Sequence, residues 1–574
     1  MTTAPLSVSD QESRPIGYVV GGSLQGTLRV RLTVSPQTIQ EGSFVTIRSG
    51  DWQFYGTVVD LQLGATDPRF ADEPAEARLP SGLVDLLHGQ TLYTNLEVLP
   101  KLMAEIGPEP GTPEYDAWAR EHPAGGRILS VRTVPLHHAT VRLASAGDVA
   151  EIFGEPSERN FVLGYTREQG HPIPIDLEKF VQRSAGIFGA TGTGKSFLTR
   201  MILAGLIHYN QAAVLVFDMH NEYGFDDIAS DTREPVIGLR TKFPGRVRVV
   251  GLGSDARIHG RSPDFNLVLA ERDLEPEDIE MLTRELNLKE TTPTTLAALV
   301  QSFGERWFHE FRQMEVGAEV TNEDGKKVPA PNSVAYWANA VGTNVMAAEG
   351  LHNKLRRLFE KPYIVADPPP GATIQQIIQL LEAGQHVVLS FGHYESDLDY
   401  LLVTNVLTRH IREAWVKKTE AFRSDKSQNP PPRPLVIVLE EAHKLLNREL
   451  AGQTTFSTIA REMRKYFVTL LVVDQRPSQI YDEVMSQLGT RISGWLGDES
   501  DIHAVLSGLA DRDQLRGMLT HLQPREEVLV MGWGVPMAIP IRSRRYDAQF
   551  WEELLGASHQ MPASLEEATK KLGF

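Results

Sequence analysis

The stretch Gly189-Ala-Thr-Gly-Thr-Gly194-Lys195-Ser196 decides the fold of this 574-residue chain. It matches the eight-position pattern of a P-loop, in which glycines let backbone N–H groups face the phosphates of a nucleotide. An apolar run at 185–188 precedes it, and apolar residues at helical spacing follow from Phe197 to Ile207. The order strand, glycine loop, helix predicts a nucleoside-triphosphate site rather than a chance glycine turn.

The side chains of this stretch have separate expected roles. Lys195 is expected to reach the β- and γ-phosphates of ATP, and the Ser196 hydroxyl is expected to ligate Mg²⁺. The other predicted nucleotide-binding residues are Gly189, Thr191, Gly192, Thr193, Gly194 and Phe197.

Composition narrows the class of protein. Hydrophobic residues make up 41% and charged residues 23%, which is ordinary for a globular protein, and the length predicts more than one domain. The longest apolar runs are too short to cross a bilayer, the N-terminus lacks the form of a signal peptide, and cysteine is absent. We therefore expect a cytoplasmic protein with no membrane segment. The net charge of −17 argues against a protein that coats DNA with its whole surface, so any DNA contacts must be local.

The N-terminal part predicts a small antiparallel β-barrel. Short alternating apolar runs separated by glycines and polar pairs occur at 17–20, 28–32, 44–47 and 55–59. Two further segments, 91–98 and 126–134, are expected to close the barrel, and 136–153 is expected to lead into the next domain. The predicted organisation is a disordered N-terminus at 1–14, a barrel domain at 15–155, an ATPase domain at 156–545 and a tail at 546–574. In the tail, Ser564-Leu-Glu-Glu567 has the form of a capping box that starts a terminal helix.

The larger domain has the pattern of an α/β fold. Apolar strands alternate with helices, which predicts a parallel sheet covered on both faces, as in a RecA-like P-loop core. Residues 264–380 are mostly helical and form a predicted insertion on this core. The candidate helices of the insertion are 274–286, 295–311 and 333–359.

A pair of carboxylates follows one of the predicted core strands. Leu435–Leu439 is apolar and ends in Glu440 and Glu441. This is the arrangement that a metal ion and an attacking water require, so we expect Glu440 to hold Mg²⁺ and Glu441 to polarise the water. The alternative is that both are solvated residues at the start of a helix.

A third strand, Thr469–Val473, is expected to lie between the P-loop strand and the strand that ends in Glu440. Gln475 at its tip would then contact the γ-phosphate or the water, unless it only caps the strand. Arg183 and Arg464 are candidates to stabilise charge in the transition state; a surface salt bridge is the alternative for each.

Together these segments resemble the HerA family, within the HerA/FtsK group of hexameric DNA-translocating ATPases. The barrel is similar to the HAS-type barrel that precedes the ATPase core in this family. The resemblance covers most of residues 15–545, and it rests on Gly189–Ser196, Val216–Tyr223, Glu440–His443, Ala460–Lys465 and Gln475–Ser478.

The resemblance implies a homo-hexameric ring that hydrolyses ATP between subunits and threads double-stranded DNA through a central pore. It also implies a partner nuclease of the NurA type in DNA end processing and repair, or an effector protein in antiphage defence. By the resemblance, Arg183 and Arg464 would act across the subunit interface, and Asp218 and Glu222 would form an acidic pair that orders the site.

Two functions stay open at this point. One is a motor that moves along DNA and drives the nuclease; the other is an ATP-binding hexameric scaffold that regulates an antiphage effector without sustained translocation. If DNA is bound, the first candidate contacts are Lys354, Arg356 and Arg357 on a predicted insertion helix. The alternative for these three residues is a solvated helix face.

Overall fold

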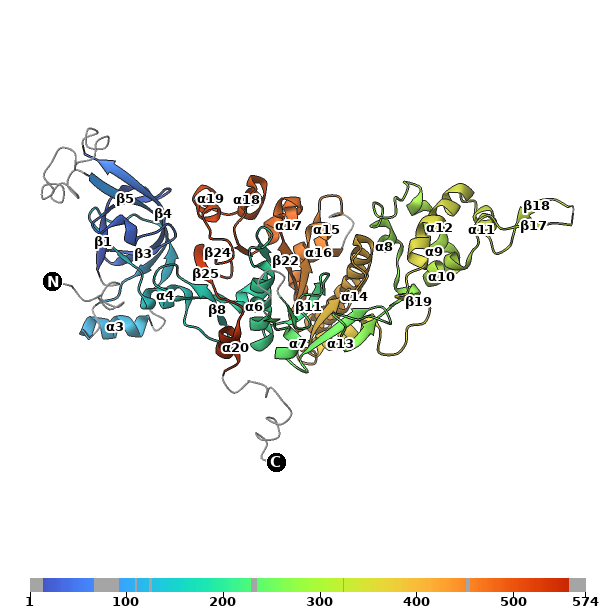
Figure 1. Cartoon of the computed structure of the whole chain (residues 1–574). Helices are drawn as coiled ribbons and strands as arrows, with labels where there is room; N and C mark the ends of the chain where they lie inside the picture. Colours follow the sequence, from blue (N-terminus) through green and yellow to red (C-terminus); the bar gives the residue numbers. More distant parts are fainter. Residues whose placement is uncertain are drawn as a thin grey trace, which may run out of the picture. The chain divides into compact units, whose positions relative to one another are not determined.

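The structure is a computed structural model that describes residues 14–66, 92–108, 111–122, 126–228, 235–323, 325–450 and 455–556 (Figure 1). Its residues fall into two compact units, each described by itself. The first unit covers Met1–Phe180, Gly189–Gly194 and Thr490–Arg545, and the second covers Val181–Phe188, Lys195–Gly489 and Tyr546–Phe574. The disordered segment expected at 1–14 lies outside the described residues except for Arg14, and so does the capping box at Ser564.

The predicted small antiparallel barrel is confirmed. Its strands hydrogen-bond in the order β2-β1-β7-β3-β4-β5, and β5 pairs back onto β2, which closes the ring. The strands are β1 (Pro15–Gly22), β2 (Leu28–Leu32), β3 (Phe44–Ser49), β4 (Trp52–Ala65), β5 (Leu92–Glu105) and β7 (Thr140–Leu143), with η1 (Pro36–Thr38) after β2.

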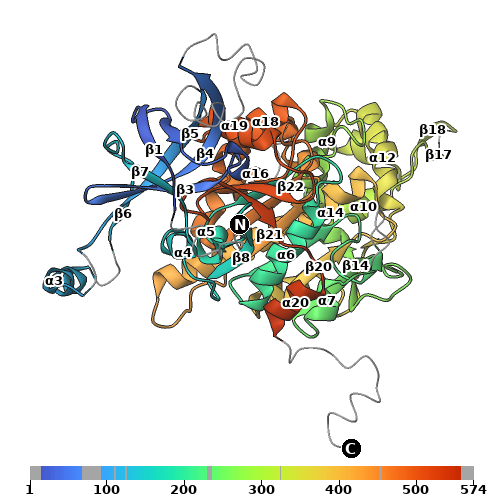
Figure 2. The same cartoon turned by 60° about the vertical axis from the view of Figure 1, so that its left-hand side comes forward.

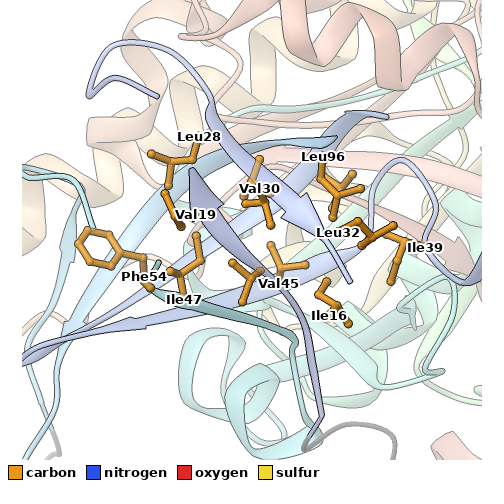
Figure 3. Packing of buried hydrophobic residues seen from close by; sticks show 14 of the residues in the cluster. Ile16, Val19, Leu28, Val30, Leu32, Ile39, Val45, Ile47, Phe54 and Leu96 are labelled. Atoms are coloured by element: carbon orange, nitrogen blue, oxygen red, sulfur yellow. The ribbon is translucent and has the colours of Figure 1, made fainter. Parts of the chain in front are cut away.

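Alternation of side chains fills the barrel interior. In β2, Leu28, Val30 and Leu32 are buried while Arg29 is exposed and Arg31 is half-buried, as a period of two requires. Figure 3 shows these residues meeting the inward side chains of the other strands. The buried cluster also includes Ile16, Val19, Ile39, Val45, Ile47, Phe54, Val58, Leu96, Val98, Met103, Ala139 and Val141.

One barrel strand was assigned wrongly from sequence. Residues 126–134 contribute only β6 (Ile128–Ser130), which pairs with β5 and lies outside the closed ring. The missing ring strand is β7, which lies between β1 and β3 in the segment expected to link the domains. β7 has four residues and one fully buried side chain, Val141, so its alternation is too short to be recognised.

The rest of the first unit adds an antiparallel group of strands. β23 pairs with β24, β24 with β25, β25 with β8 and β8 with β9, all antiparallel. The elements are α3 (Pro113–Glu121), α4 (Ala146–Phe153), β8 (Asn160–Tyr165), β9 (Pro172–Asp176), β23 (Thr490–Ser493), α18 (Glu499–Leu506), α19 (Arg512–Thr520), β24 (Glu527–Gly532) and β25 (Ile539–Ser543).

The second unit contains the predicted parallel sheet. Its strands follow the order β15-β14-β20-β11-β21-β22-β10, and neighbouring strands run parallel. Most of these residues are buried, as in a sheet covered on both faces. Figure 2 shows β14, β20, β21 and β22 beside the helices α6 and α14. The strands are β10 (Ala185–Phe188), β11 (Ala213–Asp218), β14 (Val247–Leu252), β15 (Phe265–Leu267), β20 (His386–Ser390), β21 (Leu435–Glu440) and β22 (Val468–Asp474).

Helices pack against this sheet. α6 contacts β10 and β11, α13 contacts β11 and β20, and α16 contacts β22. The helices are α5 (Leu177–Gln182), which begins in the first unit, α6 (Lys195–His208), α7 (Leu239–Lys242), α13 (Ile374–Glu382), α14 (Asp397–Ser424), α15 (His443–Leu446), α16 (Thr455–Glu462), η6 (Met463–Tyr466), η7 (Pro477–Gln479), α17 (Asp482–Gln487) and α20 (Ala548–Leu555). Short pairs are formed by β12 (Asp227–Ile228) with β13 (Pro235–Val236) and by β16 (Leu269–Ala270) with β19 (Ile364–Val365).

The insertion is mostly helical as predicted, but its helices are shorter. The segment 295–311 breaks at Gly304, and 333–359 breaks at Gly342; both glycines have positive φ values, of 55° and 73°. In Figure 1 a hairpin extends away from α11 and α12. The elements are η4 (Glu271–Asp273), α8 (Pro276–Glu280), α9 (Thr292–Phe303), η5 (Gly304–Arg306), α10 (Trp307–Gln313), β17 (Glu319–Thr321), β18 (Lys327–Pro329), α11 (Val334–Val341) and α12 (Val345–Phe359).

Candidate active site

The P-loop backbone requires its glycines. Gly192 and Gly194 have φ values of 77° and 89°, in the left-handed region that glycine adopts without a steric penalty. The loop closes on itself because the Thr193 hydroxyl donates to the Ala190 carbonyl at 2.8 Å. A Cβ atom at Gly189 would lie 2.5 Å from the Thr193 Oγ1 atom, so a side chain there would push this turn apart.

The sheet order brings the predicted acidic residues together at the carboxyl ends of the parallel strands, which we call the acidic edge. β22 lies between β10 and β21, as predicted, and all three strands are parallel. Phe188, the last residue of β10, pairs with Asp474, and Glu440 pairs with Val473. The carboxyl ends of these strands therefore meet beside the start of α6, where Lys195 lies.

Glu440 is a buried carboxylate with an incomplete set of partners. The Tyr223 hydroxyl donates to its Oε1 at 2.7 Å, and the Tyr400 hydroxyl donates to its main-chain carbonyl at 2.7 Å. No described residue donates to Oε2, although the side chain is only 6% exposed. Burial raises the pKa of Glu440 well above its ordinary value. A cation, or water bound to a cation, would supply the missing partner, so the residue fits the predicted metal role.

Glu441 lies in a different environment. Its φ of 44° is left-handed, which is unusual for a residue with a side chain. The Gln475 side-chain amide donates to Glu441 Oε1 at 2.9 Å, and His443 Nδ1 lies 3.6 Å from Oε2. Gln475 was predicted to contact the γ-phosphate or the water; in the structure its described partner is the Glu441 carboxylate.

Sequence reasoning missed the pairing of His443 with Asp474. The His443 main-chain N–H donates to Asp474 Oδ2 at 2.7 Å, and Nδ1 lies 3.0 Å from the same oxygen. The hydrogen bond to Asp474 raises the pKa of His443. Glu441, His443 and Asp474 bring one ligand atom each within 4.8 Å of one another. The signals in the sequence were a histidine two residues after Glu441 and an aspartate directly before Gln475.

Asp218 orders the turn that follows β11. Its Oδ1 accepts the Glu222 N–H at 2.7 Å and its Oδ2 accepts the Tyr223 N–H at 3.0 Å. Burial raises the pKa of Asp218 to about 6. The predicted acidic pair is therefore close in space, and Asp218 positions Tyr223, the donor to Glu440.

Two cations accompany these acids. Burial lowers the pKa of Lys195, while the carboxylates of Glu441, Asp474 and other acids act in the opposite direction. The buried Arg200 guanidinium donates to the Glu222 carbonyl, and it lies 5.5 Å from the centre of the Phe197 ring. Phe197, directly after the P-loop, thus lies beside the guanidinium of Arg200, one helical turn further on. The edge thus brings together the lysine predicted to bind phosphates and the two carboxylates predicted to act on a metal ion and a water.

Comparison with known proteins assigns the family. A family model described as "Helicase HerA, central domain" matches residues 161–411, which include the P-loop, Asp218 and Glu222. The DNA double-strand break repair helicase HerA of Sulfurisphaera tokodaii is 23% identical over 528 residues, covering 90% of each chain. Residues 161–411 belong to the HerA central-domain family, and the chain as a whole is similar to HerA helicases. It is an ATPase of the P-loop class.

Other relatives extend this comparison. The HerA helicase of Saccharolobus solfataricus is 23% identical over 526 residues, covering 90% of this chain and 89% of the relative. Among solved structures, VirB4 of Thermoanaerobacter pseudethanolicus aligns with a TM-score of 0.42 at 17% identity, covering 69% of this chain and 99% of that one.

The two candidate arginine fingers, Arg183 and Arg464, lie near the amino ends of the parallel strands, and the acidic residues lie at the carboxyl ends. Arg183 precedes β10, and Arg464 lies in η6 just before β22, where its side chain is exposed. The Phe467 N–H donates to the Arg464 carbonyl at 3.2 Å. Because β22 runs for seven residues at about 3.3 Å each, roughly 20 Å separates this edge from Gln475. Arg464 is therefore too far away to reach the acidic edge of its own chain.

The candidate DNA contacts lie on α12 of the insertion, and the structure does not bring them to the acidic edge. Arg356 pairs with Glu360 at 3.1 Å, and Arg357 donates to the Glu285 carbonyl at 2.5 Å. Lys354 donates to the Asn287 carbonyl. Each basic group thus has a local partner, and Arg356 and Arg357 remain exposed.

The lengths and hydropathies of the helices in the described segments show whether any of them could cross a membrane. None of the helices in these segments has both the length and the apolar character that crossing a membrane needs.

Proposed function

We propose that this HerA-family ATPase is a cytoplasmic motor that translocates double-stranded DNA as a homo-hexameric ring, with the DNA in its central pore. Its partner would be a nuclease of the NurA type in DNA end processing and repair. The proposal is supported by relatives named as DNA double-strand break repair helicases, which align over about 90% of both chains. It is also supported by the chemistry of the acidic edge.

The observation that carries the proposal is the environment of Glu441. Gln475 holds one of its oxygens and His443 lies beside the other, so the carboxylate has a fixed position next to the P-loop lysine. A positioned carboxylate can take a proton from an attacking water. This is the step that ATP hydrolysis needs from the protein.

The remaining residues bind and orient ATP. Lys195 and the P-loop N–H groups hold the phosphates, and Phe197 lies one helical turn from Arg200. Mg²⁺, held by Ser196 and Glu440, would neutralise phosphate charge. Tyr223 and Asp218 keep Glu440 in place, because Asp218 fixes the turn from which the Tyr223 hydroxyl reaches it.

The proposed site is completed by a second subunit. Arg464 is the first candidate for an arginine finger and Arg183 the second. Both lie at the edge of the sheet away from their own P-loop, so they can act only on nucleotide held by another chain. This arrangement supports a ring in which each interface contains one site.

Stimulation by DNA tests the motor proposal. Steady-state ATPase activity should rise when double-stranded DNA is added, and the stimulation should fall with salt because phosphate contacts release counterions. Turnover that ignores DNA but requires an effector protein would instead support the alternative, an ATP-binding hexameric scaffold in antiphage defence.

A further inference from the structure

An arginine outside the predicted site residues, Arg525, contacts the P-loop. Arg525 lies in the turn between α19 and β24, and its Nε donates to the Gly192 carbonyl at 2.9 Å. Its φ of 71° is left-handed, a backbone conformation that is unfavourable for a residue with a side chain. Both groups belong to the first unit. The chain thus adopts an unfavourable backbone conformation where this side chain meets the loop.

The contact controls one peptide plane of the loop. The Gly192 carbonyl and the Thr193 N–H belong to the same planar peptide, so holding the carbonyl fixes the direction of the N–H. That N–H donates to the Ala190 carbonyl at 3.3 Å, which closes the turn of the P-loop. The contact therefore favours the closed turn and places a positive charge beside a loop that binds phosphates.

The turn that carries Arg525 is itself held by a buried ion pair. The Arg167 guanidinium lies 2.8 Å from Glu527 Oε1 through its Nε and donates to Oε2 at 2.9 Å through its Nη2. Glu527 Oε2 also accepts the Gln523 N–H at 2.9 Å. The side chain of Arg167 is only 8% exposed. Loss of one partner from a buried pair is costly because the other charge stays uncompensated. The position of Arg525 therefore depends on Arg167.

The same network continues into the barrel. Arg167 Nη1 donates to the Glu41 carbonyl at 2.5 Å, and the Glu41 carboxylate accepts from His521 at 2.6 Å. Glu41 lies in the barrel segment between η1 and β3. Polar contacts thus join the barrel to Glu527 through Arg167, and the turn that precedes Glu527 carries Arg525, which contacts Gly192.

We propose that Arg525 is a positioning residue of the P-loop and that the barrel sets nucleotide affinity through the Glu41–Arg167–Glu527 network. The proposal rests on ATP binding at this loop and not on DNA translocation. A partner that shifts the barrel segment around Glu41 would change the affinity of the site for nucleotide.

Substitution of Arg525 in the full chain tests the first half. Arg525→Gly removes the side chain and suits the left-handed backbone, so any loss reports on the guanidinium and not on backbone strain. Because a charged hydrogen bond contributes about 1.5 kcal/mol or more, the Kd for ATP and ADP should rise roughly tenfold. The kcat at saturating ATP should change less than about twofold, and Arg525→Lys should recover part of the affinity.

Two controls separate this proposal from the function itself. Arg516→Ala removes an exposed, ion-paired arginine from the same unit and should leave the Kd unchanged. Lys195→Ala should abolish tight binding; if it binds normally, the ATP site is assigned wrongly. If Lys195→Ala loses binding while Arg525→Gly keeps the wild-type Kd, the role of Arg525 is overturned.

A double-mutant cycle tests the link to the barrel. Arg167→Met keeps the volume but removes the charge, and it should raise the nucleotide Kd because Arg525 loses its support. The double variant Arg167→Met/Arg525→Gly should then bind no more weakly than Arg525→Gly alone. If the fold-increase in Kd of the double variant equals the product of the two single-variant increases, the two sites act independently and the link is overturned. Should Arg167→Met fail to fold, His521→Ala replaces it, with the same two outcomes.

Discussion

At the scale of single residues, two adjacent carboxylates have opposite surroundings. Glu440 is buried, with a raised pKa and one oxygen that accepts from no described residue. Glu441 is partly exposed and held by Gln475. The buried residue fits a cation, and the residue with a fixed, accessible carboxylate fits a water. The different environments of these two glutamates thus support the different roles proposed for them.

Replacing the proposed base should stop turnover without loss of binding. Glu441→Gln keeps the shape but cannot accept the proton of the attacking water, so kcat should fall about 10²–10⁴-fold. The Kd for ATP should stay within a few-fold of the wild-type value. Glu462→Gln, at an exposed glutamate paired with Lys465, is the matched control and should retain full activity. A Glu441→Gln variant that hydrolyses ATP at the normal rate would show that another residue is the base.

His443 should contribute stability that depends on pH. Its pKa is raised above 6.5 in the fold by the hydrogen bond to Asp474, so this contribution is present below pH 6.5 and is lost as pH rises through the folded pKa. The free energy of unfolding, measured with urea, should be higher for wild type than for His443→Asn, and this difference should be larger at about pH 5.5 than at about pH 8.5. Equal differences in the free energy of unfolding at both pH values would mean that folding does not raise the pKa of His443.

At the scale of elements, apolar runs predicted the core strands well. Each long buried strand gives a strong signal by itself, and the polar residues that follow β21 and β22 were correctly placed at one edge. The missed β7 and the misassigned β6 have four and three residues, which is too few for alternation to be distinctive. The insertion helices were predicted too long because Gly304 and Gly342 interrupt apolar periodicity without ending it.

The contacts that complete the site could not be predicted from sequence. Tyr223 reaches Glu440 across 217 positions, and Arg525 reaches Gly192 across 333. Such pairs depend on strand order and on turn geometry, neither of which a local pattern contains. The P-loop and the two glutamates were recognisable because each is a local pattern tied to one chemistry.

The α12 patch gives a prediction about DNA. If Arg356 and Arg357 contact phosphates, the double variant Arg356→Ala/Arg357→Ala should bind DNA more weakly and lower the slope of log K against log salt by about two. The control is Arg306→Ala, since Arg306 forms a similar exposed pair with Glu310. An unchanged salt slope in the double variant would remove α12 from the DNA-binding surface.

At the scale of the whole molecule, the geometry of one chain implies a shared site. The acidic edge holds the P-loop lysine, the metal-side carboxylate and the base, but it holds neither Arg183 nor Arg464. Arg464 precedes β22, whose length places it roughly 20 Å from that edge, and Arg183 precedes the parallel strand β10. In the proposed ring, the arginine that completes each site therefore comes from a second chain.

Subunit mixing tests this central claim most directly. Arg464→Ala should bind ATP but lose roughly 10³-fold or more in rate, and Lys195→Ala should also be inactive. Mixed after subunit exchange, the two variants should regain part of the ATPase activity, because some interfaces would join an intact P-loop to an intact Arg464. Each variant is also mixed with wild type, to show that active sites tolerate inactive neighbours. Recovered activity in the mixture is the predicted result; tolerance of inactive neighbours without any recovery between the two variants would contradict a site shared through Arg464.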